Sequence, residues 1–248
     1  MAAVVSPERA EIARALMLEL FPEGFEERET SEGLELAAYT DAGGEERLWA
    51  AFGRVSANEV PAGWEERWRA FHRPIRVGPI WVGPPWEERP ADATAVVIDP
   101  GRAFGTGGHP TTRLSLELLL EVERGSLVDV GCGSGVVAIT AVRLGFAPVI
   151  AIDHDSAAAE ATRRNASSNG VTLEIRHAEA SAAGLPDANV VVANVSAPFA
   201  RELAGALKTE SLISSGYLES EQLALPGFRR VERRVEDGWA ADLFRREG

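Results

Sequence analysis

A glycine loop at the end of an apolar run is the first stretch of the chain whose residue types could bind a ligand. The loop, VDVGCGSGV, holds Gly131, Gly133 and Gly135, and it includes Asp129 just before the glycines. Because position 136 is valine, the spacing matches neither the G-x-G-x-x-G loop of dinucleotide sites nor a P-loop. An acid beside the loop would repel a pyrophosphate but suits an ammonium or sulfonium group. We therefore predict a nucleotide-like ligand that is not held by its phosphates; a purely structural tight turn is the alternative.

A carboxylate follows at the end of the next apolar run, VIAID, which closes on Asp153. Doubly wound folds place an acid at this point to accept hydrogen bonds from a ribose diol. Asp153 is therefore predicted to be the second half of a nucleoside site. We interpret His154 and Asp155 as a polar turn with a helix cap. We expect no metal site, because adjacent residues in a turn rarely converge on an ion.

A second glycine-dense loop, DPGRAFGTGGHPTT, occupies residues 99–112 ahead of the helical pattern LSLELLLEV. Its four glycines let the backbone approach a ligand closely, and Pro110 suits the first turn of a helix. His109 taken alone is more typical of a capping or packing residue than of a catalytic one.

The two loops together resemble those of a known family. DVGCGSG with Asp153 looks like the first two motifs of class I S-adenosylmethionine-dependent methyltransferases. DPGxAFGTGxHPTT closely resembles the loop before the cofactor motif in ribosomal protein methyltransferases of the PrmA type, which modify large-subunit ribosomal protein eleven. The resemblance covers residues 61–248, with VVVANV and SSGYLESE in the fourth and fifth strand regions, and departs from the family pattern at Gly108 and Ser196.

This resemblance implies S-adenosyl-L-methionine as the cofactor and a basic ribosomal protein of the large subunit as the partner. It also implies that the N-terminal domain grips this substrate. Cofactor contacts are implied for Thr112, Gly131, Asp153 and Asn194, and Phe104 with the glycines of both loops would shape the methyl-transfer chamber. The expected cofactor-binding set is Phe104, Gly105, Thr106, Thr112, Gly131, Gly133, Gly135, Asp153 and Asn194.

Methyl transfer from a sulfonium requires no covalent nucleophile, so positioning and desolvation supply most of the acceleration. The acceptor must be an uncharged amine, of a lysine or of an N-terminus. We predict that Asn194, through its side-chain or backbone carbonyl, orients that amine, and we keep His109 as a candidate proton acceptor. Asn194 could instead merely end a strand.

Apolar periodicity predicts the elements that position these motifs. Strand patterns occupy residues 95–98, 127–131, 149–153, 171–177, 189–194 and 212–216, and helical patterns 114–122, 136–145, 156–170 and 200–208, with Ser156 as the expected cap of the third helix. Alternating strands and helices are typical of right-handed βαβ units and a parallel sheet covered on both faces. Asp237-Gly238 between two alternating runs predicts a hairpin. We therefore predict an α/β, doubly wound, mostly parallel seven-stranded sheet closed by an antiparallel C-terminal hairpin.

A smaller domain is expected ahead of this sheet. A helix over 9–20, two strands around 31–33, a helix over 45–52 and a strand-like run over 53–60 predict an α+β domain in residues 1–60. Trp64 and Trp68 share one face of a linker helix over 61–72, and the catalytic domain, 73–248, opens with an extended or hairpin stretch over 73–89.

Composition narrows the function classes further. A formal charge of -13 disfavours a nucleic-acid surface, because such surfaces neutralise phosphates with Lys and Arg. No window is apolar enough for a membrane span and the first residues lack a signal peptide, and the one cysteine cannot form an intrachain disulfide. We expect a soluble, cytoplasmic monomer.

Three alternatives stay open from the sequence. The chain could methylate another protein lysine or a small molecule, or it could be a non-catalytic adaptor that binds adenosylmethionine or the ribosomal protein. A dehydrogenase is the weakest, because Val136 replaces the glycine that its cofactor loop requires.

Overall fold

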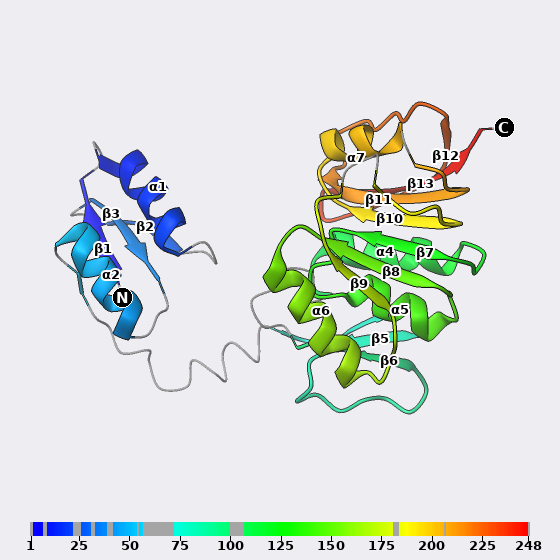
Figure 1. Ribbon diagram of the computed structural model, residues 1–248, viewed down its shortest axis with the longest axis horizontal. Helices are drawn as coiled ribbons and strands as arrows, with labels where there is room; N and C mark the ends of the chain where they lie inside the picture. The colour runs from blue at the N-terminus through cyan, green and yellow to red at the C-terminus, as the bar shows by residue number, and fades with distance from the viewer. Residues whose placement is uncertain are drawn as a thin grey trace. The chain divides into compact units, whose positions relative to one another are not determined.

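The computed structural model describes two compact units, Met1–Arg67 and Trp68–Gly248 (Figure 1). The described residues are 2–6, 9–21, 26–30, 33–38, 42–53, 55–56, 72–99, 107–180, 184–205 and 207–247. The linker helix expected over 61–72, with Trp64 and Trp68, therefore lies outside them except for its last residue.

The N-terminal unit combines helices with a small antiparallel sheet. Its elements are β1 (Ala2–Val5), α1 (Ala10–Leu20), β2 (Glu26–Thr30), β3 (Gly33–Ala37) and α2 (Ala42–Phe52). The three strands form an antiparallel sheet in the order β1-β3-β2. Met17, Leu36 and Leu48 are fully buried in its core. Strand β1 is only four residues long and was not predicted from the sequence. A strand was expected over 53–60, and its described part forms an isolated bridge from Ser56 to Ala2.

The C-terminal unit confirms the predicted α/β architecture. Its elements are β4 (Ile75–Val77), β5 (Ile80–Gly83), β6 (Thr94–Val97), α4 (Pro110–Leu120), β7 (Leu127–Val130), α5 (Val136–Leu144), β8 (Val149–Asp153), α6 (Ser156–Ser168), β9 (Glu174–His177), β10 (Val190–Asn194), α7 (Ala197–Ala204), β11 (Ser211–Leu218), β12 (Phe228–Glu236) and β13 (Trp239–Arg246). The seven-stranded sheet has the order β12-β13-β11-β10-β7-β8-β9. Its five strands from β11 to β9 are parallel, and β13 and β12 close it as an antiparallel hairpin.

Apolar side chains cover both faces of the large sheet. On one face α4 and α5 share a core with the small sheet β4-β5-β6, and α7 covers the other face. Helix α5 lies between β6 of the small sheet and β7 and β8 of the large one (Figure 1). The parallel strands end together at one edge of the sheet, where their following loops must meet. Among the helices of the described residues, none has the length and apolarity needed to span a bilayer.

The starts of α2 and α7 and the cap of α6 differ from the sequence prediction, and α2 begins at Ala42 rather than at 45. The Asp155 side chain caps α6, because it accepts a hydrogen bond from the Ala157 amide at 2.8 Å. This agrees with the interpretation of residues 154–155 as a polar turn with a helix cap, and the expectation that Ser156 is the cap was wrong. Helix α7 begins at Ala197, three residues before the expected start at 200, because Ser196 takes the extended cap conformation and Pro198 occupies the first turn.

Candidate functional site

The glycine loop joins β7 to α5 and needs its glycines. Gly131, Gly133 and Gly135 have φ values of 72°, 54° and 82°, in the left-handed region that favours glycine. A Cβ on Gly135 would lie 2.7 Å from a methyl carbon of Thr162 on α6. Gly135 therefore cannot carry a side chain without moving Thr162.

Helix α6 packs against the glycine loop and bonds its backbone carbonyls. The Thr162 hydroxyl donates to the carbonyl of Gly133 at 3.0 Å, and the Asn165 side chain donates to the carbonyl of Ser134 at 2.9 Å. Both side chains are buried. These two bonds fix the direction of the loop backbone before any ligand arrives, which lowers the entropic cost of binding.

The Asp153 carboxylate, at the end of β8, also bonds the glycine loop. One oxygen accepts from the Gly133 amide at 2.9 Å and the other from the Asp155 amide at 3.0 Å. Asp153 is only 6% exposed, so its position is fixed. Each carboxylate oxygen can accept more than one hydrogen bond, and the pair can still receive two hydroxyl groups of a diol.

Asp129 faces the interior, contrary to the sequence argument that placed its charge beside the ligand. It is 2% exposed and accepts from the Ala138 amide in α5 at 3.1 Å. Burial, with a smaller contribution from the negative charge of Asp153, raises the pKa of Asp129 to about 7. Its main contact is with the first turns of α5.

His109 is the N-cap of α4, which confirms the capping interpretation. Its Nδ1 accepts from the Thr111 amide at 3.3 Å and lies 2.8 Å from the Thr111 hydroxyl. Desolvation, followed by the positive charge of Arg113, lowers the pKa of His109. A neutral imidazole that accepts at Nδ1 carries its proton on Nε2. The basic nitrogen of His109 is thus committed to the helix cap.

Thr112 and Asn194 lie at the same end of one sheet face. Asn194 follows Val192 by two residues, so it points to the α4 side of β10. Its register partner Ser215 bonds Ser115 of α4 through their hydroxyls at 2.7 Å, and Ser115 is one turn after Thr112. The Thr112 side chain is buried, and its hydroxyl has no hydrogen-bond partner within the described structure.

The structure thus brings together most of the predicted cofactor-binding residues. Asp153 bonds the glycine loop directly, and Thr112 and Asn194 lie at the carboxyl edge from which that loop emerges. Phe104, Gly105 and Thr106 lie outside the described residues. Trp239, at the start of β13, was not predicted as a neighbour of this region, yet its ring meets the His109 ring edge-on with 4.8 Å between centroids. No sequence signal marks a contact between residues so far apart.

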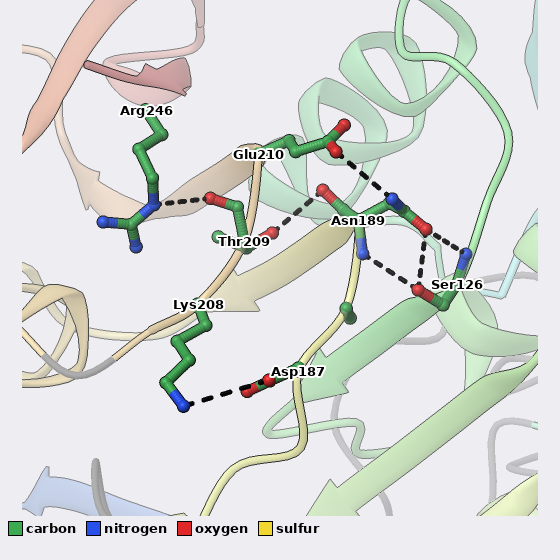
Figure 2. A pocket seen from close by; sticks show the side chains of 8 residues that line it. Ser126, Asp187, Asn189, Lys208, Thr209, Glu210 and Arg246 are labelled. Carbon is green, nitrogen blue, oxygen red and sulfur yellow. Dashed lines mark hydrogen bonds and ion pairs between the residues drawn. The ribbon is translucent and has the colours of Figure 1, made fainter. Parts of the chain in front are cut away.

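A second feature lies at the opposite, amino edge of the sheet. A pocket of about 550 Å³ is lined there by Ser126, Asp187, Ala188, Asn189, Lys208, Thr209, Glu210 and Arg246. Its polar side chains are paired with one another or with backbone, including Ser126 with Asn189 at 2.8 Å and Lys208 with Asp187 at 4.0 Å (Figure 2). These pairs tie together the segments that precede β7, β10 and β11 at the amino edge. Within the described ranges, no group of three or more His, Cys, Asp and Glu side chains could hold a metal ion.

Comparisons with known proteins show the family to which the chain belongs. Residues 19–246 match the family described as "Ribosomal protein L11 methyltransferase (PrmA)". A ribosomal protein L11 methyltransferase of Aliivibrio fischeri (strain MJ11) is 45% identical over 187 residues, covering 73% of this chain and 61% of that protein. One from Pelobacter propionicus is 38% identical over 205 residues, covering 74% of this chain and 66% of that protein. The chain therefore spans less than two thirds of the length of these curated relatives.

A solved structure gives the same picture. The crystal structure of ribosomal protein L11 methylase from Lactobacillus delbrueckii subsp. bulgaricus is 26% identical, with a TM-score of 0.63. The match covers 71% of this chain and 100% of that one. The matched part of the chain therefore shares its overall fold with a protein of that description.

Proposed function

Since the chain belongs to the ribosomal protein L11 methyltransferase (PrmA) family, we propose that it transfers methyl groups from S-adenosyl-L-methionine to ribosomal protein L11. The acceptors are lysine or N-terminal amines. The observation that carries this proposal is the direct bond between Asp153 and the Gly133 amide, which joins the glycine loop and the acid into one nucleoside cradle.

The residues present fit this cofactor. Gly131, Gly133 and Gly135 offer backbone without side chains, and the Asp153 carboxylate has acceptor capacity for a ribose diol. The buried Thr112 hydroxyl has no partner within the described structure, and a buried polar group of this kind costs free energy until a partner arrives. When bound, S-adenosyl-L-methionine supplies an electrophilic methyl group on a sulfonium.

The chain's own task is then to present an uncharged amine. A lysine amine titrates about three units above neutral pH, so presenting it neutral costs roughly 4 kcal/mol, against about 1 for an N-terminal amine. Asn194, at the end of β10, accepts a hydrogen bond from an N–H of the amine. This bond orients the lone pair of the amine nitrogen toward the methyl group. His109 acts as the cap of α4 and positions Thr111 and Thr112.

The two compact units have different roles in this proposal. The C-terminal unit holds the cofactor cradle, and the N-terminal unit recognises the ribosomal protein. The chain's charge of -13 favours encounter with a basic protein partner.

Mass spectrometry of purified L11 tests this function. L11 incubated with the chain and S-adenosyl-L-methionine should gain mass in whole methyl steps, and peptide mapping should place them on lysine or N-terminal amines. Asn194→Ala should slow the gain roughly 100-fold, because loss of orientation at the reacting group has effects of that size.

Two results would contradict the proposal. L11 that binds the chain but keeps its mass would favour the adaptor alternative. Methylation of other proteins in a ribosome-free extract, with L11 untouched, would favour a different substrate.

A further inference from the structure

Arg113 in the first turns of α4 connects three separate parts of the C-terminal unit. Its Nε donates to both carboxylate oxygens of Glu236, at 2.9 and 3.1 Å, and its Nη2 lies 2.8 Å from Glu236 Oε1. The same Nη2 lies 3.5 Å from Asp237 Oδ2, and Nη1 donates to the carbonyl of Gly108 at 2.5 Å. The side chain is 21% exposed. One guanidinium therefore joins α4, the turn of the C-terminal hairpin and the loop that precedes α4.

The place of this cation in the helix is unfavourable by itself. Arg113 is the fourth residue of α4, and positive charge near a helix N-terminus is opposed by the helix dipole. The two acids of the hairpin turn offset this cost. A bidentate Arg–carboxylate pair is also the strongest and most directional form of ion pair, so it fixes the guanidinium in one orientation.

That orientation matters because it holds a carbonyl of the second glycine loop. Gly108 is followed directly by the cap residue His109 and, one turn into the helix, by the buried Thr112 hydroxyl. On the other side of Gly108, Gly107 has a φ of 98° and sits against β5, where an added Cβ would lie 3.0 Å from Val82. The end of the loop is thus held between β5 and the Arg113 side chain.

We propose that Arg113, oriented by Glu236, is a positioning residue that fastens the hairpin turn to the loop before α4 and so preorganises residues 107–112 for the cofactor. This role rests on the proposed function for the identity of the ligand. Arg113 touches no reacting atom in this account; it acts through the Gly108 carbonyl and the start of α4.

A second arginine provides a matched control. Arg234 of β12 ties the same hairpin to the same helix, through Glu117 at 3.0 Å and Glu121 at 3.4 Å. These partners lie in the later turns of α4, away from the loop. Arg234→Gln should therefore lower the melting temperature about as much as Arg113→Gln without altering the loop.

The experiment compares full-length wild type, Arg113→Gln, Arg113→Lys, the double variant Arg113→Gln/Glu236→Gln, and Arg234→Gln. The Kd for S-adenosyl-L-methionine is measured by calorimetry, and amide hydrogen exchange of residues 107–112 is measured without cofactor. If the variant leaves the loop ordered about a tenth of the time, Arg113→Gln raises the Kd about tenfold and speeds exchange. Arg113→Lys should be intermediate, and Glu236→Gln in an Arg113→Gln background should add nothing further. Arg234→Gln should leave Kd and exchange within twofold of wild type, a change near the usual scatter of such couplings.

The proposal is overturned if Arg113→Gln leaves either the Kd or the exchange of 107–112 unchanged, or if Arg234→Gln changes them equally. A wild-type chain that binds no S-adenosyl-L-methionine would sink the proposed function alone. The exchange data would then still decide: faster exchange in Arg113→Gln and not in Arg234→Gln supports the fastening, and equal exchange removes it.

Discussion

Two buried acids near the glycine loop, Asp153 and Asp129, have different roles because their side chains contact different parts of the structure. Asp153 bonds two loop amides at the sheet edge and can still accept from a ligand. Asp129 lies inside the sheet face against α5 and bonds one helix amide. Both positions look alike in the sequence, as an acid at or near the end of an apolar run. Only the direction of each side chain separates a ligand contact from a helix contact.

The burial of Asp129 predicts a pH effect on stability. Its folded pKa, about 7, lies above the ordinary value of 3.8, so the folded state keeps a proton that the unfolded chain has released. The resulting stabilisation is fully present below the ordinary pKa and is lost as the pH rises through the folded pKa, by at most about 1.4 kcal/mol per pH unit. Asp129→Asn retains an acceptor oxygen and cannot ionise. Its melting temperature should fall less than that of wild type between about pH 5 and about pH 8; parallel curves for the two proteins would refute the assignment.

His109 can be tested by a substitution that keeps its cap. Asparagine is among the best N-cap residues, so His109→Asn preserves the α4 cap and removes the imidazole. Because the basic nitrogen of His109 is bonded to Thr111, we expect the methylation rate to stay within about threefold, the usual context dependence of a retained cap. A loss of roughly 100-fold or more, the scale of general acid–base catalysis, would restore the proton-acceptor role.

At the scale of elements, the packing of α6 against the glycine loop fixes the conformation of that loop. Gly135→Ala would force an alanine to a φ of 82° and place its Cβ 2.7 Å from Thr162. Gly170 has a φ of 62° and open space around it, so Gly170→Ala tests the backbone cost alone. We expect about 1 kcal/mol of lost unfolding free energy for Gly170→Ala and at least about twice that for Gly135→Ala. Chemical denaturation measures both, and equal losses would contradict the close packing of the loop on α6.

The arginine content of the C-terminal hairpin suggests a nucleic-acid surface, but the contacts of these arginines indicate a structural role. The segment 228–246 holds six arginines, a density typical of nucleic-acid surfaces. Five of them bind partners within the C-terminal unit: Arg230 and Arg233 bind the buried Asp242, Arg234 binds Glu117, Arg245 binds Ser211, and Arg246 binds the carbonyl of Thr209. Arg230 and Arg233 therefore join the two strands of the hairpin, and Arg234, Arg245 and Arg246 fasten it to neighbouring segments.

Local signals explain why so much of the fold could be predicted. The alternation of apolar strands and helices and the Asp237-Gly238 turn depend on neighbouring residues, and the structure confirms the sheet and hairpin that they predict. The sequence offered both Asp155 and Ser156 as caps of α6, because both residue types are good caps, and only the structure shows that Asp155 takes this role. Contacts between distant residues, such as Arg113 with Glu236, have no local signal at all. The glycines and the residues at strand ends could therefore be predicted as parts of the candidate site. The hairpin residues that contact α4 and its cap, Glu236 and Trp239, could not.

Across the whole molecule, the excess of 38 acidic over 25 basic side chains predicts electrostatic steering of a basic substrate. The value of kcat/KM for L11 should fall roughly tenfold over about a tenfold rise in salt, because screening removes long-range attraction. The value of kcat should change little, since bound substrate is held at short range. Steady-state kinetics at several NaCl concentrations measure both. A flat kcat/KM would mean that the net charge plays no part in substrate encounter.

The central claim is that Asp153 and the glycine loop form the binding site of the adenosyl donor. Calorimetric titration of S-adenosyl-L-methionine into wild type and Asp153→Ala tests it most directly, with Asp155→Asn as a control that keeps the α6 cap. Loss of two charge-assisted hydrogen bonds, about 1.5–3 kcal/mol each, should weaken binding by at least about 100-fold in Asp153→Ala, while Asp155→Asn binds as wild type. Unchanged affinity in Asp153→Ala would place the donor elsewhere on the protein and contradict the account.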